Sequence, residues 1–216
     1  MPTPVSRRPL ASRGTTWARR LAQWLADRRI PPNAISLASL AFAALGAVAM
    51  LAVPLSGAGA RSILLLCAAI CIQLRLLCNL LDGMVAIEGG LGTRSGEIYN
   101  ELPDRIADPL LIVPAGYAAG ISWAPELAWT AALLALLTAY IRALGAIAGL
   151  PQGFQGPMAK PHRMAAMTVG LVLAAAVAPF GWSGAVLVVT LAIILLGTAL
   201  TVLRRTRAIL HELEST

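Results

Sequence analysis

Six apolar segments, each near the roughly 20 residues that an α-helix needs to cross a bilayer, constrain the fold of this chain most strongly. They lie at about 34–54, 62–87, 97–119, 126–149, 164–180 and 183–204, and short breaks rich in glycine and proline separate them. Of the 216 residues, 58% are hydrophobic and only 12% are charged, which is more apolar than a soluble core requires. The sequence therefore predicts an all-α polytopic membrane protein with six transmembrane helices in a single membrane domain, residues 1–216.

The segment before the first span predicts a helix at the membrane surface. Residues 1–14 are polar and basic and are expected to be disordered, whereas 15–30 place Trp17, Leu21 and Trp24 on one helical face. Pro31 and Pro32 end this interfacial helix, and Asn33 is expected to cap the next one. The six-helix bundle then occupies 34–204, followed by a cytosolic tail at 205–216.

The basic residues predict the orientation of the bundle. The net charge is +7, and with a cytosolic N-terminus nearly all the cations flank spans on the cytosolic side, leaving only Arg61 in the outer loops. Both termini are then cytosolic, as in a protein of the bacterial inner membrane. The cations form no patch with interleaved aromatic residues, so membrane lipid is the expected partner and nucleic acid is not. The three cysteines share one apolar span without CxxC spacing, and no disulfide is expected.

Polar residues cluster where the second span ends and the third begins, at the predicted cytosolic surface. Ionisable groups at membrane depth are costly, so such a cluster predicts a functional site. Helical spacing places each set on one face: Arg75, Asn79, Asp82 and Ala86 on the second span, and Asn100, Asp104 and Asp108 on the third. Carboxylate and amide oxygens are ligands for hard cations such as Mg²⁺ or Mn²⁺. Gly83, Ala86 and Gly96 leave room for a bulky ligand.

This cluster resembles the signature of the CDP-alcohol phosphotransferase family, Asp-x2-Asp-Gly-x2-Ala-Arg-x8-Gly-x3-Asp-x3-Asp. The register matches without a gap, and the resemblance extends over nearly the whole chain. Asn79 stands at the first Asp of the signature, Asp82 at the second, Asn100 at the third and Asp104 at the fourth. Ile87 replaces the signature arginine, and Pro32-Asn33-Ala34-Ile35-Ser36 is similar to the start of the family's first span.

Two amides in place of carboxylates leave three outcomes open. Four carboxylates balance two dications, whereas Asp82 and Asp104 alone supply two negative charges. One metal ion then binds instead of two, or Glu101 or Asp108 joins the site and restores charge, or catalysis has been lost. We favour retained activity, because acids in a membrane helix without a function would be costly.

The resemblance implies an enzyme of phospholipid synthesis that transfers a phosphatidyl group from a CDP-alcohol to a hydroxyl of a small polar acceptor and releases CMP. It implies a CDP-diacylglycerol donor, one or two Mg²⁺ or Mn²⁺ ions, and a homodimer. Asp104 would be the general base, and the implied metal ligands are Asn79, Asp82, Asn100, Asp104 and Asp108. Substrate contacts would come from Gly83, Ala86, Gly96, Glu101, Arg75 and Arg142. The rival hypotheses are a non-catalytic CDP-lipid-binding homologue and a small ion-coupled transporter.

Several of these residues also have plainer interpretations. Asp108 and Glu101 can be metal-adjacent or simply ion-paired with Arg105, and Arg75 and Arg142 can contact phosphate or pair with acids. Lys160, His162 and Arg163, expected in the loop before the fifth span, bind an acidic head group or only follow the positive-inside rule. Pro103 either kinks the third span or marks its start.

Overall fold

The protein is all-helical throughout the part that the structure, a computed structural model, describes: residues 15–150 and 156–215, without the side chains of Ala58 and Glu97. The long helices are α2 (Pro32–Ala52), α3 (Ala58–Glu88), α4 (Gly96–Ala118), α5 (Ala124–Ile147), α6 (Lys160–Val177) and α7 (Ser183–Glu214). A shorter helix, α1 (Thr16–Asp27), precedes them, and two 3₁₀ turns, η2 (Val53–Leu55) and η3 (Ala178–Phe180), extend α2 and α6.

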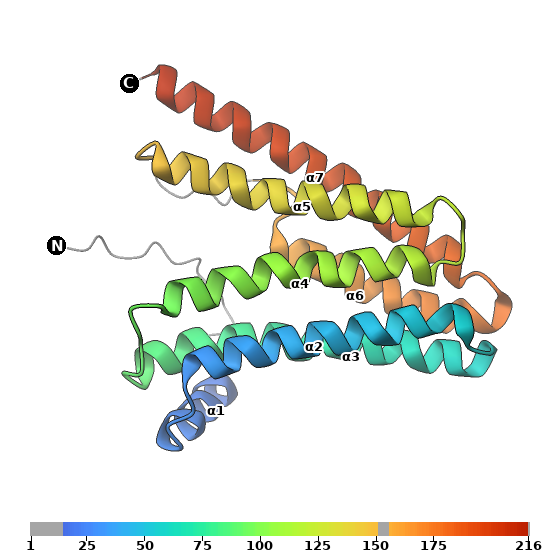
Figure 1. The fold of residues 1–216 in the computed structure, drawn as a ribbon, viewed down its shortest axis with the longest axis horizontal. Coiled ribbons are helices and arrows are strands. Elements are labelled where there is room, and N and C mark those ends of the chain that lie inside the picture. The colour runs from blue at the N-terminus through green and yellow to red at the C-terminus, as the bar shows by residue number, and fades with distance from the viewer. Residues whose placement is uncertain (1–14, 151–155, 216) are drawn as a thin grey trace.

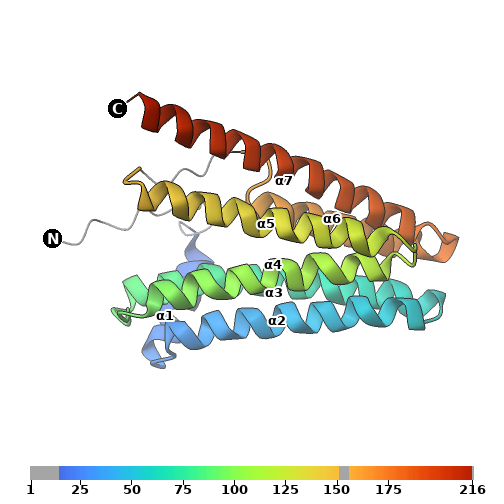
Figure 2. The same cartoon turned by 45° about the horizontal axis from the view of Figure 1, so that its top comes forward.

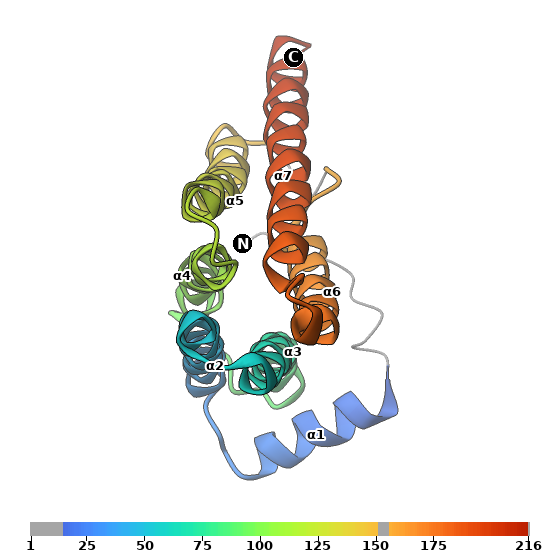
Figure 3. The ribbon, with the colours of Figure 1, turned by 90° about the vertical axis from the view of Figure 1, so that its right-hand side faces the viewer.

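The six long helices alternate in direction along the chain and form a bundle of two rows. Seen along the bundle, α2, α4 and α5 form one row and α3, α6 and α7 the other (Figure 3). Contacts between neighbours follow this arrangement, with α2 packed on α3 and α4, α5 on α4 and α7, and α6 on α3 and α7. A turn by 45° shows α7 crossing the bundle obliquely above α5 and α6 (Figure 2). The core consists of small residues and leucine, isoleucine and methionine, so the helices approach closely.

Within the part of the chain that the structure describes, five helices are long and apolar enough to cross a membrane: Pro32–Leu55, Gly59–Glu88, Ala124–Ile147, Lys160–Phe180 and Ser183–Glu214. The helix that corresponds to the predicted third span, α4, has 23 residues and lies in the bundle beside them (Figure 1). It carries Glu101, Asp104, Arg105 and Asp108 and is therefore less apolar. The fold class is confirmed as an all-α membrane protein, and the polar helix α4 carries Asp104 and Asp108.

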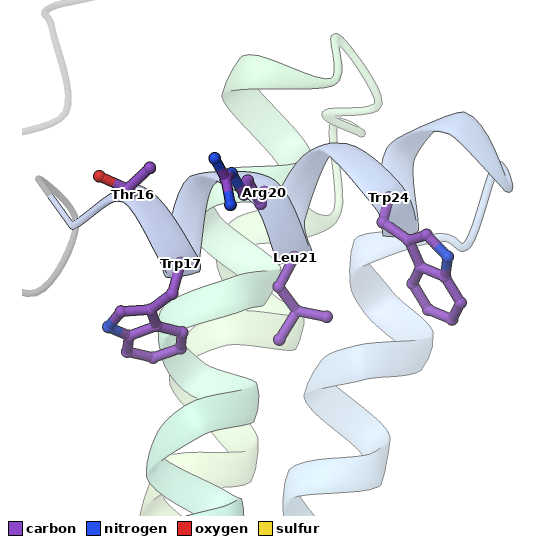
Figure 4. A pocket seen from close by; sticks show the side chains of 5 residues that line it. All are labelled: Thr16, Trp17, Arg20, Leu21 and Trp24. Atoms are coloured by element: carbon purple, nitrogen blue, oxygen red, sulfur yellow. The ribbon is translucent and has the colours of Figure 1, made fainter.

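Helix α1 lies across one end of the bundle, the same end at which α3 turns into α4 (Figures 1 and 3). Ala18 and Ala22 are buried against Leu81 and Val85 near the end of α3. Trp17, Leu21 and Trp24 point to one side of α1 while Arg20 points to the other, and together with Thr16 they line a shallow pocket (Figure 4). This confirms that the helix is amphipathic. Its place at a membrane surface stays a prediction.

Two sequence predictions about helix ends differ from the structure. Asn33 does not cap α2, since the helix begins at Pro32 and the Asn33 side chain instead donates to Thr93 Oγ1 at 3.4 Å. For Pro103, the structure shows the interpretation that places it within the helix, since α4 already begins at Gly96. Helix α7 continues to Glu214, through residues predicted to form a tail. Residues 1–14, predicted as a disordered tail, lie outside the described residues.

Helix α4 approaches α5 closely at Gly116. A Cβ atom built there would lie 2.7 Å from both the Ala124 carbonyl oxygen and Ala128 Cβ. Backbone atoms cannot yield as a flexible side chain does, so Gly116→Ala is expected to destabilise the protein by about 1–3 kcal/mol. Thermal unfolding in detergent measures this effect. The control is Gly59→Ala, where a new Cβ meets nothing within 4 Å. Equal stability of the two variants would contradict the close approach.

Candidate functional site

The two halves of the polar motif meet between α3 and α4. Asn79 Nδ2 donates to Asp104 Oδ1 at 2.5 Å, and Arg75, one turn earlier on α3, donates to the same oxygen at 3.3 Å. The interval of four residues from Arg75 to Asn79 places both on the face that meets α4. Helical spacing thus predicted the side of each helix that carries the site.

Asp108 joins α3, α4 and α6 in a buried ion-pair network. Its Oδ1 accepts from Arg75 Nη2 at 3.1 Å and its Oδ2 from Arg163 Nη2 at 2.6 Å. Arg75 is fully buried, and Asp108 and Arg163 are nearly so. Of the two interpretations of Asp108 that the sequence left open, the structure shows ion pairing, with these two arginines instead of Arg105. Asp108 as a metal ligand has no support from these contacts.

Asp82 is buried one turn beyond Asn79 and is held from α2. Ser36 Oγ donates to its Oδ2 at 2.7 Å, and the backbone N–H of Gly83 donates to its Oδ1 at 2.6 Å. Asp82 also lies near enough to Asp104 and Lys160 to interact with their charges. Neutral donors therefore fix the orientation of the Asp82 carboxylate, and its charge lies close to the charges of Asp104 and Lys160.

Lys160 completes the cluster from α6. It is the first residue of that helix, not part of a loop, and its ammonium forms an ion pair with Asp104 Oδ2. Its side chain is 22% exposed and that of Asp104 13% exposed, so the pair lies at the rim of the buried network. Arg163, also expected in the loop, is a buried residue of α6 that donates to the Met158 carbonyl as well as to Asp108.

A second, separate ion-pair group lies on α4 and α5. Glu101 Oε2 accepts from Arg142 Nη2 at 2.6 Å and is also paired with Arg105. Pairing is again the interpretation that the structure shows for Glu101 and Arg142. A substrate that contacted Glu101 or Arg142 would have to compete with this ion pair.

The remaining predicted positions surround the cluster less closely. Asn100 is exposed on the second turn of α4, Gly83 and Ala86 are half-buried, and a Cβ at Gly96 would make only an ordinary contact with Thr93. The side chain of Glu97 lies outside the described residues. The roles predicted for these residues stay predictions.

Sequence reasoning gave Ser36 no role in the site, and it considered Lys160 and Arg163 only as head-group contacts or positive-inside charge in a loop. Ser36 falls in the segment similar to the family's first span, but nothing in its spacing connects it to Asp82. Lys160 carries a signal that is visible in the sequence: it is the only lysine, since the 17 basic residues include 16 arginines.

The donor set around Asp104 fits a hard divalent cation, provided that amide oxygens take part. Among the described residues, no group of three or more His, Cys, Asp or Glu side chains is placed to hold a metal. Asp82 and Asp104 supply two carboxylates, and the amides of Asn79 and Asn100 are the oxygen donors at the other motif positions. Because Asn79 presents its Nδ2 to Asp104, its amide oxygen is left for a ligand.

Comparisons with known proteins show the same fold over nearly the whole chain. No family model matches. Phosphatidylinositol phosphate synthase of Mycobacterium tuberculosis with CDP-DAG bound superposes with a TM-score of 0.73 and 20% identity, covering 90% of this chain and 94% of that one. The structure of that enzyme with manganese and citrate gives a TM-score of 0.71 and 21% identity, covering 89% and 88%. The chain thus has the fold of a phosphatidylinositol phosphate synthase.

One curated protein is similar in sequence over part of the chain. Inner membrane protein YnbA of Escherichia coli (strain K12) is 40% identical over 92 residues, which is 42% of this chain and 42% of that protein. The match therefore spans less than half the length of its relative. It agrees with the apolar helices in indicating an integral membrane protein.

Proposed function

We propose that this protein is a CDP-alcohol phosphotransferase that moves a phosphatidyl group from CDP-diacylglycerol to a hydroxyl of a small polar acceptor. The observation that carries the proposal is the Asn79–Asp104 contact, because it joins the two halves of the family motif across α3 and α4. The fold likeness to an enzyme whose structure has CDP-DAG bound supports it. We further propose a homodimer in the bacterial inner membrane, with both termini and the site facing the cytosol.

In the proposed reaction, the acceptor hydroxyl oxygen forms a bond to the lipid-side phosphorus of the donor. The bond from that phosphorus to the bridging oxygen breaks, and CMP leaves with the bonding electrons. Asp104 takes the acceptor's proton as general base. Arg75 and Asn79 keep the Asp104 carboxylate in place, and Asp108 in turn keeps Arg75 in place.

A divalent metal ion, when bound, offsets negative charge on the donor pyrophosphate. Asp82 and Asp104, with the amides of Asn79 and Asn100, would hold it. We assign Asp108 a structural role beside the site, since both of its oxygens accept from buried arginines. Glu101 and Arg142 remain proposed substrate contacts, together with the small residues Gly83, Ala86 and Gly96.

One observation favours a second candidate, a homologue that binds CDP-lipid without turnover. Lys160 and Arg75 both contact Asp104, so the proposed base is surrounded by cations, and two motif carboxylates are amides. Such a protein would bind nucleotide and metal but leave the donor intact. A transporter has no comparable support, because the described long helices are continuous and the polar cluster occurs once among them.

A paired measurement on the purified protein distinguishes the two candidates. The enzyme is expected to release CMP from CDP-diacylglycerol when Mg²⁺ or Mn²⁺ and a mixture of hydroxyl acceptors are present, and EDTA should stop the release. The double variant Asn79→Asp, Asn100→Asp should then bring little benefit or do harm. If the wild-type protein released no CMP and the double variant did, the protein would be the non-catalytic homologue.

A further inference from the structure

The position of Lys160, the only lysine in the sequence, bears on the number of metal ions that the site accepts. Lys160 begins α6 and reaches Asp104, the residue with the most charged partners in the motif. A lysine ammonium is a compact charge on a flexible stem, whereas an arginine guanidinium is a planar fork suited to fixed bidentate pairing. Arg75 and Arg163 have the fixed role toward Asp108, and Lys160 stands at the rim, where a ligand would arrive.

The described charges of the cluster already balance. Asp82, Asp104 and Asp108 supply three negative charges, and Arg75, Lys160 and Arg163 supply three positive ones. The donor pyrophosphate, esterified at both ends, carries two negative charges. One dication therefore neutralises the loaded site, whereas a second would leave two excess positive charges in a poorly solvated place, where uncompensated charge is costly.

We infer that the site binds a single divalent ion, and that the Lys160 ammonium, paired with Asp104, supplies the positive charge that a second ion would otherwise bring. This inference rests on the proposed function, because it concerns the donor pyrophosphate of that reaction. Asn79 and Asn100 are then neutral ligands adapted to one ion. Two carboxylates replaced by amides remove two negative charges, which is the charge of one dication.

Counting bound Mn²⁺ tests the inference without turnover. Electron paramagnetic resonance of free Mn²⁺, with purified protein and saturating CDP, is expected to show one bound ion per chain in the wild type. The variant Asn79→Asp, Asn100→Asp should bind two. Two ions in the wild type would overturn the inference, and so would none. Counting bound ions requires no reaction. One bound ion per chain without CMP release would therefore contradict the proposed function and still support this inference.

Variants of Lys160 test its part as a fixed charge. Lys160→Met should raise the affinity for Mn²⁺ about tenfold or more, because a like charge next to the ion is removed. The same variant should bind CDP more weakly in EDTA, whereas Lys160→Arg should stay near the wild type in both measurements. Arg207→Met, at an exposed position of α7, is the matched control. Unchanged Mn²⁺ and CDP affinities in Lys160→Met would overturn the role of Lys160.

The single lysine also provides a spectroscopic readout in the unmodified protein. Labelling with ¹³C-lysine gives one lysine side-chain signal from the whole chain, because no other lysine is present. One equivalent of Mn²⁺ should broaden that signal, and the same amount of Mg²⁺, which is diamagnetic, should not. An unbroadened signal at full Mn²⁺ occupancy would place the ion away from Lys160 and contradict the inference.

Discussion

Asp104→Asn should lower the rate of CMP release by about 100-fold or more, because the amide cannot take the acceptor's proton. The substitution keeps the size of the side chain and can still accept from Asn79, so the fold is expected to survive. The loss should therefore appear in kcat, and in EDTA, where no metal is bound, CDP should bind nearly as well as to the wild type. Initial rates of CMP release together with CDP binding measure the two effects separately.

Asp27→Asn is the matched control for this variant, because Asp27 is an exposed carboxylate at the end of α1. It should release CMP at the wild-type rate. If Asp104→Asn retained most of the activity, Asp104 would not be the base. The proposed mechanism would then have to use another group.

Asp108→Asn should destabilise the protein by about 3–5 kcal/mol, the largest effect on folding that we expect from a single substitution. Asp108 is 3% exposed and is the anion shared by Arg75 and Arg163. Neutralising it leaves two buried guanidinium groups with too little negative charge near them, and an unpaired buried charge is far more costly than the pair itself is worth. Unfolding in mixed detergent micelles measures the loss.

Glu88→Gln is the control for this prediction, because Glu88 is an exposed acid at the end of α3. It should unfold at the wild-type midpoint. If Asp108→Asn also unfolded at the wild-type midpoint, the two arginines would have to find other anions. The stabilising role of the buried Arg75–Asp108–Arg163 network would then be contradicted.

The sequence predicts the helices of this protein well because apolar length is a local property. Each predicted span corresponds to one helix, and the helix carrying acids is the one that hydropathy alone represents least well. The last span was predicted to end at residue 204, because Arg204 and Arg205 look like the cytosolic end of a span, whereas helix α7 continues to Glu214. Arg205 is in fact buried and donates to the Thr138 carbonyl of α5, so packing extends the helix past its first charges.

The candidate site was predictable only on the two helices whose residues are close in sequence. Spacing placed Asn79 and Asp104 on facing sides of α3 and α4, and the structure joins them. Partners from α2 and α6 depend on how distant helices pack, which no local pattern contains. Ser36 and Lys160 therefore entered the site only with the structure.

Ion pairing explains why several predicted ligands look different in the structure. A row of acids and arginines in a membrane helix is equally suited to metal, phosphate or mutual pairing, and spacing does not choose among them. The structure pairs Asp108 with Arg75 and Arg163, and Glu101 with Arg142. Asp82 accepts from a hydroxyl and a backbone N–H. Asp104, at the rim, is already paired with Arg75 and Lys160 and would have to exchange these cations for a metal ion.

The most direct test of the central claim is a mass balance in proteoliposomes that contain CDP-diacylglycerol. Purified protein is reconstituted into these vesicles, and one divalent metal and a set of small alcohols are then added on the side that the site faces. CMP and lipid products are then quantified together by mass spectrometry. The account predicts one new phosphatidyl-alcohol for each CMP, with neither formed by Asp104→Asn. Tight binding of CDP-diacylglycerol with every donor molecule recovered intact would contradict it.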